Sequence, residues 1–406
     1  MRKQMIWALL LSVASLVGCH DEELNFAVTL SGSQEVPPVQ TTAMASGTVT
    51  LLITQGSEDH FFSLPSGHMN KEDEPEFGND DTYALSAEID ISAVDNVLAA
   101  HIHQGSVGEN GPVAFEFTDN GDGTMIVTET DITMEQADML MGGEWYINVH
   151  TQQAPPGEVR GQIVDADTQV LAFALSGRQE VPALDTDAFG HGYATVNTGS
   201  NDIDLTVLTT GVEDAVAAHI HEGEIGTNGG VVVFLEQSTE DATVWQTPDG
   251  TSLETDVVEA MLAGGHYVNI HTPDVPSGEI RGQIFNDTVT VFAFGLSGDE
   301  EVPPVVTDAA GDGYVWFDGT TGLLSVLILT TGLEEAVAAH VHQGEIGTNG
   351  GVAVELEQDT GDMNVWRSPD NAILDEETAN ILLRGGHYLN IHTPTVPSGE
   401  VRGQID

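Results

Sequence analysis

A short histidine-containing phrase occurs three times and constrains the fold more than any other feature of the chain. It reads Ala-Ala-His-Ile-His-Gln-Gly at 99–105, Ala-Ala-His-Ile-His-Glu-Gly at 217–223 and Ala-Ala-His-Val-His-Gln-Gly at 338–344. A single histidine follows each phrase in a second apolar run, at His150, His271 and His392, at intervals of 121 residues. The repeat is therefore as long as a domain, and the 406-residue chain is predicted to hold three tandem domains.

The predicted fold class is all-β. Short runs of alternating apolar and polar residues, such as Phe26 to Leu30, are typical of strands that bury one face of a sandwich. Sustained helical periodicity is scarce. Each repeat is predicted to contain one short helix, the first over Thr133 to Met141, where a capping-type residue stands at the start and Gly142 and Gly143 follow the end.

Recurring phrases place the domain boundaries. A Ser-Gly-x-x-Glu-Val-Pro phrase opens each repeat, and Gly-Glu-Val/Ile-Arg-Gly-Gln-Ile closes it. We predict domains at 25–164, 170–285 and 291–406, joined by linkers of a few residues. The first domain carries an acidic loop insertion at 57–82, whose two histidines we interpret as solvated.

The N-terminus is typical of a targeting segment. Arg2 and Lys3 precede an apolar run that is too short to cross a bilayer, as in a secretory signal peptide. The run ends in Leu-Val-Gly-Cys, which resembles the lipobox of bacterial lipoproteins. That resemblance implies a signal peptide at 1–18, lipidation of Cys19 and a spacer at 19–24. It predicts a lipid-anchored protein of the cell envelope, at the outer membrane in a Gram-negative host. An ordinary signal peptide with a chance cysteine is the alternative.

The charge balance excludes some classes of partner. With 65 acidic and 9 basic residues, the formal net charge is −56. Nucleic-acid binding needs a basic surface that neutralises phosphates, so no nucleic-acid partner is expected. An anionic membrane surface is excluded as a direct partner for the same reason, which leaves the lipid anchor as the expected membrane contact. The acidity itself is interpreted as a source of solubility and self-repulsion.

The nine repeated histidines are candidate metal ligands. Residues two apart in a strand project from the same face, so each His-x-His pair presents two imidazoles side by side. The alternation in the second run puts the single histidine on the polar face as well, whereas His266 and His387 fall on the opposite face and are interpreted as packed residues. Three imidazoles suit copper or, less well, zinc. The predicted metal ligands are His101, His103, His150, His219, His221, His271, His340, His342 and His392.

An arginine accompanies each candidate site. Arg160, Arg281 and Arg402 occupy the closing phrase, on what the alternation predicts to be a polar face. Two roles stay open at this point. Each arginine either pairs with the nearby glutamate of the same phrase or guides an anion toward the site.

In this order, the phrases Leu-Ser-Gly-x-x-Glu-Val-Pro, Ala-His-Ile-His-x-Gly, Tyr-x-Asn-x-His-Thr and Gly-Glu-x-Arg-Gly-Gln-Ile resemble the CHRD domain, which is named for chordin. The resemblance covers nearly the whole mature chain as three copies. In animals this domain belongs to an extracellular antagonist of growth factors, so the resemblance implies a protein partner outside the cytoplasm.

A more distant likeness is to the copper-zinc superoxide dismutases, which are Greek-key β-sandwiches. That likeness implies Greek-key connections in each domain, copper ligation by the three histidines and an anion-drawing role for the arginine. The sequence lacks a histidine in the loop after His-x-His, so the bridging and zinc ligands of that family are missing.

Three functions therefore stay open. The first is a transition-metal-binding module, with copper as the favoured ion, and the second is a structural or adhesive module that binds a protein partner. The third is a superoxide dismutase-like copper redox enzyme, and no catalytic residue is predicted. For the histidines themselves, a hydrogen-bonded surface network without metal is the competing interpretation.

Overall fold

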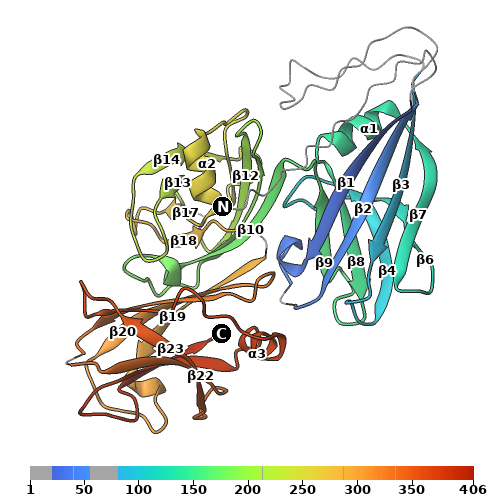
Figure 1. Cartoon of the computed structure of the whole chain (residues 1–406). Helices are drawn as coiled ribbons and strands as arrows, with labels where there is room; N and C mark the ends of the chain where they lie inside the picture. Colours follow the sequence, from blue (N-terminus) through green and yellow to red (C-terminus); the bar gives the residue numbers. More distant parts are fainter. Residues whose placement is uncertain (1–20, 40, 55–80, 213, 287, 334) are drawn as a thin grey trace, which may run out of the picture.

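The computed structural model describes residues 21–39, 41–54, 81–212, 214–286, 288–333 and 335–406. Three domains follow one another along the chain, from blue through green to red in Figure 1. Cys19, the predicted signal peptide at 1–18 and residues 57–80 of the predicted insertion lie outside the described residues.

Domain 1 consists of nine strands and one α-helix. The elements are β1 Asp21–Ser31, β2 Met44–Thr54, β3 Thr82–Asp90, β4 Val97–Gln104, β5 Val113–Glu116, β6 Thr118–Asp119, β7 Thr124–Ile132, α1 Met134–Met141, β8 Trp145–Thr151 and β9 Val159–Ile163. A short 3₁₀ turn, Gly32–Gln34, follows β1.

Domain 2 repeats the same series. Its elements are β10 Thr168–Ser176, β11 Phe189–Asn197, β12 Ile203–Thr210, β13 Ala217–Glu222, β14 Val231–Phe234, β15 Glu236–Gln237, β16 Val244–Gln246, α2 Thr255–Leu262, β17 His266–His271 and β18 Ile280–Gln283. The corresponding 3₁₀ turn is Gly177–Gln179.

Domain 3 has one strand fewer. Its elements are β19 Val289–Ser297, β20 Ala310–Asp318, β21 Leu324–Thr331, β22 Ala338–Gln343, β23 Gly351–Gln358, β24 Val365–Arg367, α3 Glu376–Leu382, β25 His387–His392 and β26 Val401–Ile405. The 3₁₀ turn of this domain is Gly298–Glu300.

One antiparallel sheet makes up each domain, and its strand order is the same in all three. In domain 1 the order is β5-β4-β8-β9-β1-β2-β3-β7-β6. Domain 3 closes into a barrel because the long strand β23 pairs with β22 at one end and with β24 at the other. The non-consecutive neighbours, such as β3 beside β7 and β1 beside β9, are crossovers of the kind that Greek-key connections produce. The predicted all-β class with three tandem domains is confirmed.

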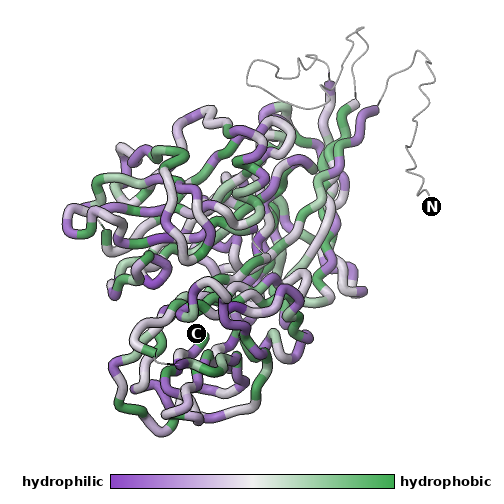
Figure 2. Tube along the Cα trace, turned by 60° about the vertical axis from the view of Figure 1, so that its left-hand side comes forward, coloured by the Kyte–Doolittle hydropathy of each residue, from purple (hydrophilic) through white to green (hydrophobic). Residues whose placement is uncertain are grey.

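Each domain encloses its own apolar core. Figure 2 shows apolar residues alternating with polar ones along the strands, as expected when one face of a sheet is buried. Ile147 and Val149 of β8 are both fully buried, and burying side chains of this size contributes roughly 2 kcal/mol each. This burial fixes strand β8, which carries the single histidine of domain 1, and its counterparts β17 and β25 are buried in the same way.

The short helices form where the sequence predicts them. The side chain of Thr133 accepts a hydrogen bond from the backbone N–H of Gln136, and the Gln136 side chain accepts one from the N–H of Thr133. This capping box starts α1 one residue after the predicted first residue. Gly143 then takes a φ of 73°, a left-handed conformation that turns the chain into β8.

Consecutive domains are packed through a repeated contact. The buried Tyr193 of domain 2 packs against Val107 of domain 1 and donates its hydroxyl hydrogen to the backbone oxygen of Glu35, 3.0 Å away. Tyr314 of domain 3 makes the same kind of contact with Ile225 and with the backbone oxygen of Glu180. The three domains are therefore held against one another instead of hanging on free linkers.

Two local predictions differ from the structure. Strand β1 begins at Asp21, inside the predicted spacer at 19–24, because Asp21 to Leu24 extend the pairing with the end of β2. The alternation that buries Ala218 and Ile220 also predicts that Val216 points inward, but Val216 is 64% exposed because it precedes β13 instead of belonging to it. Among the described residues, none of the helices has both the length and the apolar character to span a bilayer.

Candidate metal centre

Two neighbouring strands of each domain bring the three predicted histidines to one face. In domain 1, β4 and β8 are antiparallel, with His101 opposite Asn148 and His103 opposite Tyr146. Directly opposed residues point to the same side of a sheet. His150, two residues beyond Asn148, therefore projects from the same side as the His-x-His pair. Strands β13 with β17 and β22 with β25 repeat this register.

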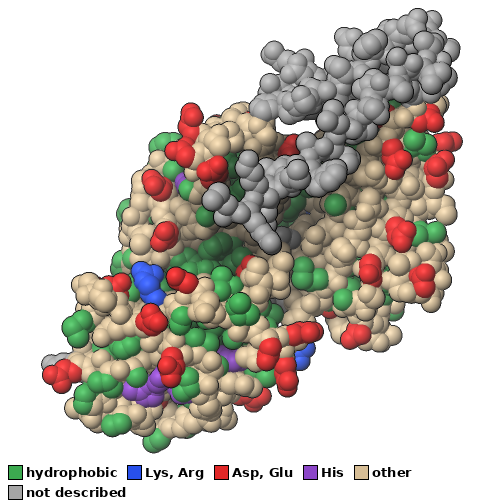
Figure 3. Space-filling view, in the orientation of Figure 1, with side chains coloured by type: hydrophobic (Ala, Val, Ile, Leu, Met, Phe, Trp, Pro, Cys, Tyr) green, Lys and Arg blue, Asp and Glu red, His purple; other side chains and the backbone are tan. Residues whose placement is uncertain are grey.

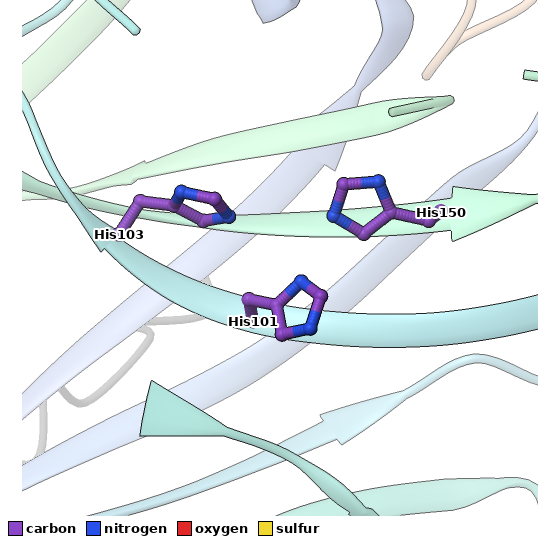
Figure 4. A group of neighbouring side chains, drawn as sticks. All are labelled: His101, His103 and His150. Carbon is purple, nitrogen blue, oxygen red and sulfur yellow. The ribbon is translucent and has the colours of Figure 1, made fainter. Parts of the chain in front are cut away.

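The three imidazoles converge on a common point (Figure 4). In domain 1 the ring centroid of His101 lies 4.9 Å from that of His150 and 5.6 Å from that of His103. In every domain, one nitrogen from each of the three rings lies within 4.8 Å of the other two. Figure 3 shows histidine side chains reaching the surface at the lower left, over domain 3. The geometric part of the sequence prediction is thus met in all three domains.

Backbone carbonyls fix which nitrogen is free in two of the three rings of each site. Nδ1 of His103 lies 2.9 Å from the carbonyl oxygen of Gly111, and Nδ1 of His150 lies 3.0 Å from that of Pro155. A carbonyl oxygen only accepts hydrogen bonds, so both rings carry their hydrogen on Nδ1 and keep a lone pair on Nε2. Outer carbonyls of this kind orient the histidine ligands of metal sites.

The remaining ring atoms are the ones that point at the centre. Among the described residues of domain 1, the buried nitrogens without a hydrogen-bond partner include Nδ1 of His101 and Nε2 of His103 and His150. Domain 3 leaves the corresponding atoms of His340, His342 and His392 unpartnered. An unpaired buried polar atom costs free energy, and a ligand shared by the three nitrogens would offset that cost in each of these two domains.

Domain 2 differs in one hydrogen bond. Nδ1 of His219 lies 3.0 Å from Nε2 of His271, whose own Nδ1 is held by the carbonyl of Pro276. His271 therefore accepts, and His219 donates a hydrogen that any bound cation must displace. Nε2 of His221 stays unpartnered, as in the other domains.

Burial favours the neutral form of these rings. Desolvation is the largest cause that lowers the pKa of seven of the nine histidines, and neighbouring histidines add to it in several of them. The seven are His101, His103, His219, His221, His271, His342 and His392. A neutral imidazole is the form that binds a metal ion.

A stacked tyrosine supports the second histidine of each pair. The Tyr146 ring lies parallel to His103, with centroids 4.9 Å apart, and its hydroxyl accepts a hydrogen bond from the N–H of Gly111. On the other side of the ring, the guanidinium carbon of Arg160 lies 3.5 Å from the ring centroid. The same stack of His, Tyr and Arg recurs in domains 2 and 3. Sequence reasoning missed the role of the tyrosine, although it stands four residues before the single histidine in every domain.

The arginines do not pair with the glutamates of the closing phrase, which bond to threonines instead, and the anion-guiding role stays a prediction. Arg160 is 1% exposed and donates hydrogen bonds to the backbone oxygens of Ser106 and Glu109, so it braces the loop that follows His103. Glu158 does not pair with it but accepts hydrogen bonds from Thr41 and Thr151. Arg281 and Arg402 are equally buried and hold the equivalent loops, because the loops cover a strand face that alternation alone assigns to solvent.

A buried glutamate beneath each site was also missed. Glu35 is 5% exposed and accepts a hydrogen bond from Asn148, the residue between Tyr146 and His150 on the site face. Desolvation raises its pKa to about 7, against the opposing effects of Arg160 and Asn148. In domain 2, Glu180 accepts a hydrogen bond from Asn269, and its pKa is likewise raised to about 7 by desolvation. In domain 3, Glu301 accepts a hydrogen bond from Asn390. These glutamates recur in the Glu-Val-Pro phrase that opens each domain, but strand alternation does not show that a residue in this turn is buried.

The packed histidines are where the sequence places them. His266 and His387 are 2% and 0% exposed, and Trp145 fills the same position in domain 1. They lie on the core side and do not join the three-histidine groups.

Comparison with known proteins identifies the domain. The family model described as the CHRD domain matches residues 26–163, 171–284 and 292–405. The chain belongs to the CHRD domain family. It is 25% identical over 298 residues to Chordin of Xenopus laevis, which covers 68% of this chain and 30% of that protein. It is 28% identical over 164 residues to Chordin of Danio rerio, covering 36% of this chain and 17% of that protein.

The chain thus spans less than a third of the length of these curated relatives. No solved structure matches the chain. The likeness to copper-zinc superoxide dismutases stays a prediction.

Proposed function

We propose that each CHRD domain of this chain binds one transition-metal ion, with copper favoured over zinc, through its three histidines. The observation that carries the proposal is the recurring set of inward-facing nitrogens, one Nδ1 and two Nε2, which is unpartnered in domains 1 and 3. Three neutral imidazoles from two strands are a donor set that copper and zinc both accept, and they leave a coordination position open.

The groups that surround the three histidines support the same proposal. Two rings of each site are oriented by backbone carbonyls, and one ring is stacked on a tyrosine that an arginine holds from below. An arrangement fixed in this way loses little conformational entropy when an ion binds. A surface network of histidines without metal would not need three unpartnered nitrogens turned toward one another in both domain 1 and domain 3.

Isothermal titration of the metal-free chain with Cu(I), Cu(II) and Zn(II) tests the proposal. The expected result is binding tighter than micromolar, with one site lost in His219→Ala. His191→Gln is the matched control, because His191 lies on β11 outside the three-histidine groups. Binding that is weaker than micromolar, or that is unchanged in His219→Ala, would contradict it.

We also propose that the chain is a display of protein-binding modules held at the cell envelope by a lipid on Cys19. The relatives named Chordin and the lipobox-like sequence support this second role. Labelling with a lipid precursor that is lost in Cys19→Ser tests the anchor. A pull-down that depends on one domain and survives replacement of all nine histidines would assign partner binding to a surface other than the metal centre.

Redox catalysis is the weaker candidate. The arginine that would draw in an anion is buried under the loops in every domain, and the whole molecule is strongly acidic. A copper-loaded chain is therefore expected to remove superoxide no faster than free copper does.

A further inference from the structure

The three sites differ at the position directly opposite the first histidine of the His-x-His pair. In domain 1 the residue directly opposite His101 on the neighbouring strand β5 is Glu116. In domain 3 the residue opposite His340 is Glu355 on β23. In domain 2 the residue opposite His219 is Phe234 on β14. Directly opposed residues of an antiparallel pair share a face, with Cβ atoms about 5 Å apart, so each of these side chains stands beside its site.

The two glutamates are free to act as ligands. Both are exposed, and among the described residues no hydrogen bond or ion pair engages either carboxylate. Each stands next to the histidine whose Nδ1 is unpartnered. The carboxylate oxygens lie outside the 4.8 Å groups formed by the three histidines, so each glutamate would have to turn toward the site to become a fourth donor.

The phenylalanine gives the middle site a different character. The Phe234 ring meets His219 edge to face, with centroids 4.8 Å apart and planes at 88°. It brings no donor atom and covers one side of the imidazole with apolar surface. This is also the domain in which two ligand nitrogens are hydrogen-bonded to each other, 3.0 Å apart, although its ring spacings match those of domain 3.

These differences point to different ions. A divalent cation bound by three neutral rings keeps its full double charge, and a carboxylate ligand offsets half of it in surroundings that are only partly hydrated. Four donors including a carboxylate suit Zn(II) or Cu(II). Three nitrogens under an apolar cover suit the singly charged Cu(I), which needs no anionic ligand.

We propose that the three sites are not equivalent: Glu116 and Glu355 complete sites for a divalent ion in domains 1 and 3, whereas Phe234 makes the domain 2 site selective for Cu(I). The proposal rests on the metal-binding function proposed above and adds the identity of the ion to it. One chain would then carry both oxidation states of copper, or zinc beside copper, on successive domains.

Exchange of the two residue types between domains 2 and 3 tests the proposal on the full chain. The loops that lead into the two strands are identical, Gly-Glu-Ile-Gly-Thr-Asn-Gly at 223–229 and 344–350, so each exchange copies a residue that a neighbouring domain already holds in the same setting. Both positions are exposed, and circular dichroism checks that the fold is kept. The probes are Zn(II) and Cu(I) alone, each titrated into metal-free protein under anaerobic conditions.

The unaltered chain is expected to bind two Zn(II) ions tightly and one weakly, with the preference reversed for Cu(I). Phe234→Glu should strengthen Zn(II) binding at the weak site of domain 2 by roughly tenfold or more. Changes to residues around metal ligands commonly alter metal affinity by this much. Glu355→Phe should remove one tight Zn(II) site. Phe234→Gln, which matches the size of glutamate without its charge, should leave Zn(II) binding near that of the unaltered chain.

The outcomes separate the two proposals. If no site binds either ion, the metal-binding function itself fails. If all three sites bind both ions equally and the exchanges change nothing, metal binding stands and the inequivalence is overturned. If Phe234→Gln strengthens Zn(II) binding as much as Phe234→Glu does, the carboxylate is not a ligand and the proposal is also overturned.

Discussion

Replacing the buried Glu180 by glutamine should make the chain more stable at alkaline pH. The folded protein raises the pKa of this carboxyl from 4.5 to about 7, chiefly by desolvation. An acid whose pKa is raised on folding binds its proton more tightly in the folded state. The contribution of this group to the free energy of unfolding is therefore fully present below about pH 4.5 and is lost as pH rises through 7.

The size of the effect follows from the shift. A change of about 2.5 pKa units corresponds to about 3 kcal/mol between the acidic and the alkaline limits, since one unit is about 1.4 kcal/mol. The side chain is 5% exposed, so solvent screening removes little of this. Glutamine suits the position, because its oxygen can accept from Asn269 Nδ2 and its amide can donate to Asn269 Oδ1, which has no partner now.

Urea unfolding of metal-free protein at pH 5 and pH 8, followed by tryptophan fluorescence, measures the effect. Glu180→Gln should be more stable than the unaltered chain at pH 8 by up to about 3 kcal/mol, and near it at pH 5. Glu240→Gln, at an exposed position, is the control and should change little at either pH. A Glu180→Gln chain that is less stable at pH 8, or whose difference from the unaltered chain does not vary with pH, would refute the reasoning.

Three further predictions concern the site and the domain contacts. Tyr267→Phe removes the acceptor for the N–H of Gly229 and should cost about 1 kcal/mol in urea unfolding and weaken metal binding in domain 2; unchanged values in both would contradict the supporting role. Tyr193→Phe removes the hydrogen bond to Glu35 across the first domain contact and should loosen it, which hydrogen exchange of residues 105–111 would detect as faster exchange; equal exchange would count against the contact. Burial lowers the pKa of His219, His221 and His271, so the metal-free fold should lose stability as pH falls below the unfolded pKa of about 6.5. Metal affinity should fall over the same range, because protons compete with the ion for the rings. A metal affinity that does not change between pH 7 and pH 5 would argue against imidazole ligands.

The 121-residue period of the histidine phrases predicts the repeat, and the short alternating apolar runs predict the all-β class. Alternation in the second run correctly separated His271 from the packed His266, because the core side of a strand must be apolar or fully satisfied. The capping residue Thr133 and the following glycines located the helix within one residue. Strand alternation and helix capping depend on residues close together in the sequence, so both can be predicted from sequence spacing alone.

Alternation failed where loops cover the outer face of the sheet. It placed Arg281 beside solvent, yet Arg281 is 1% exposed and stacks on Tyr267, which is itself buried. Two segments far apart in the sequence, the turn that carries Glu180 and the loop at 223–229, fold over this face. A pattern of period two reports which side of a strand a residue takes but not what lies above that side.

Metal content measured on the chain purified from its native host, without added metal, tests the central claim most directly. Mass spectrometry of the purified protein should find copper, alone or with zinc, approaching one ion per domain. The content should fall by about one ion when His219, His221 and His271 are all replaced by alanine, if the three rings form one site. A chain that carries no transition metal, or whose content is the same after that replacement, would contradict the account.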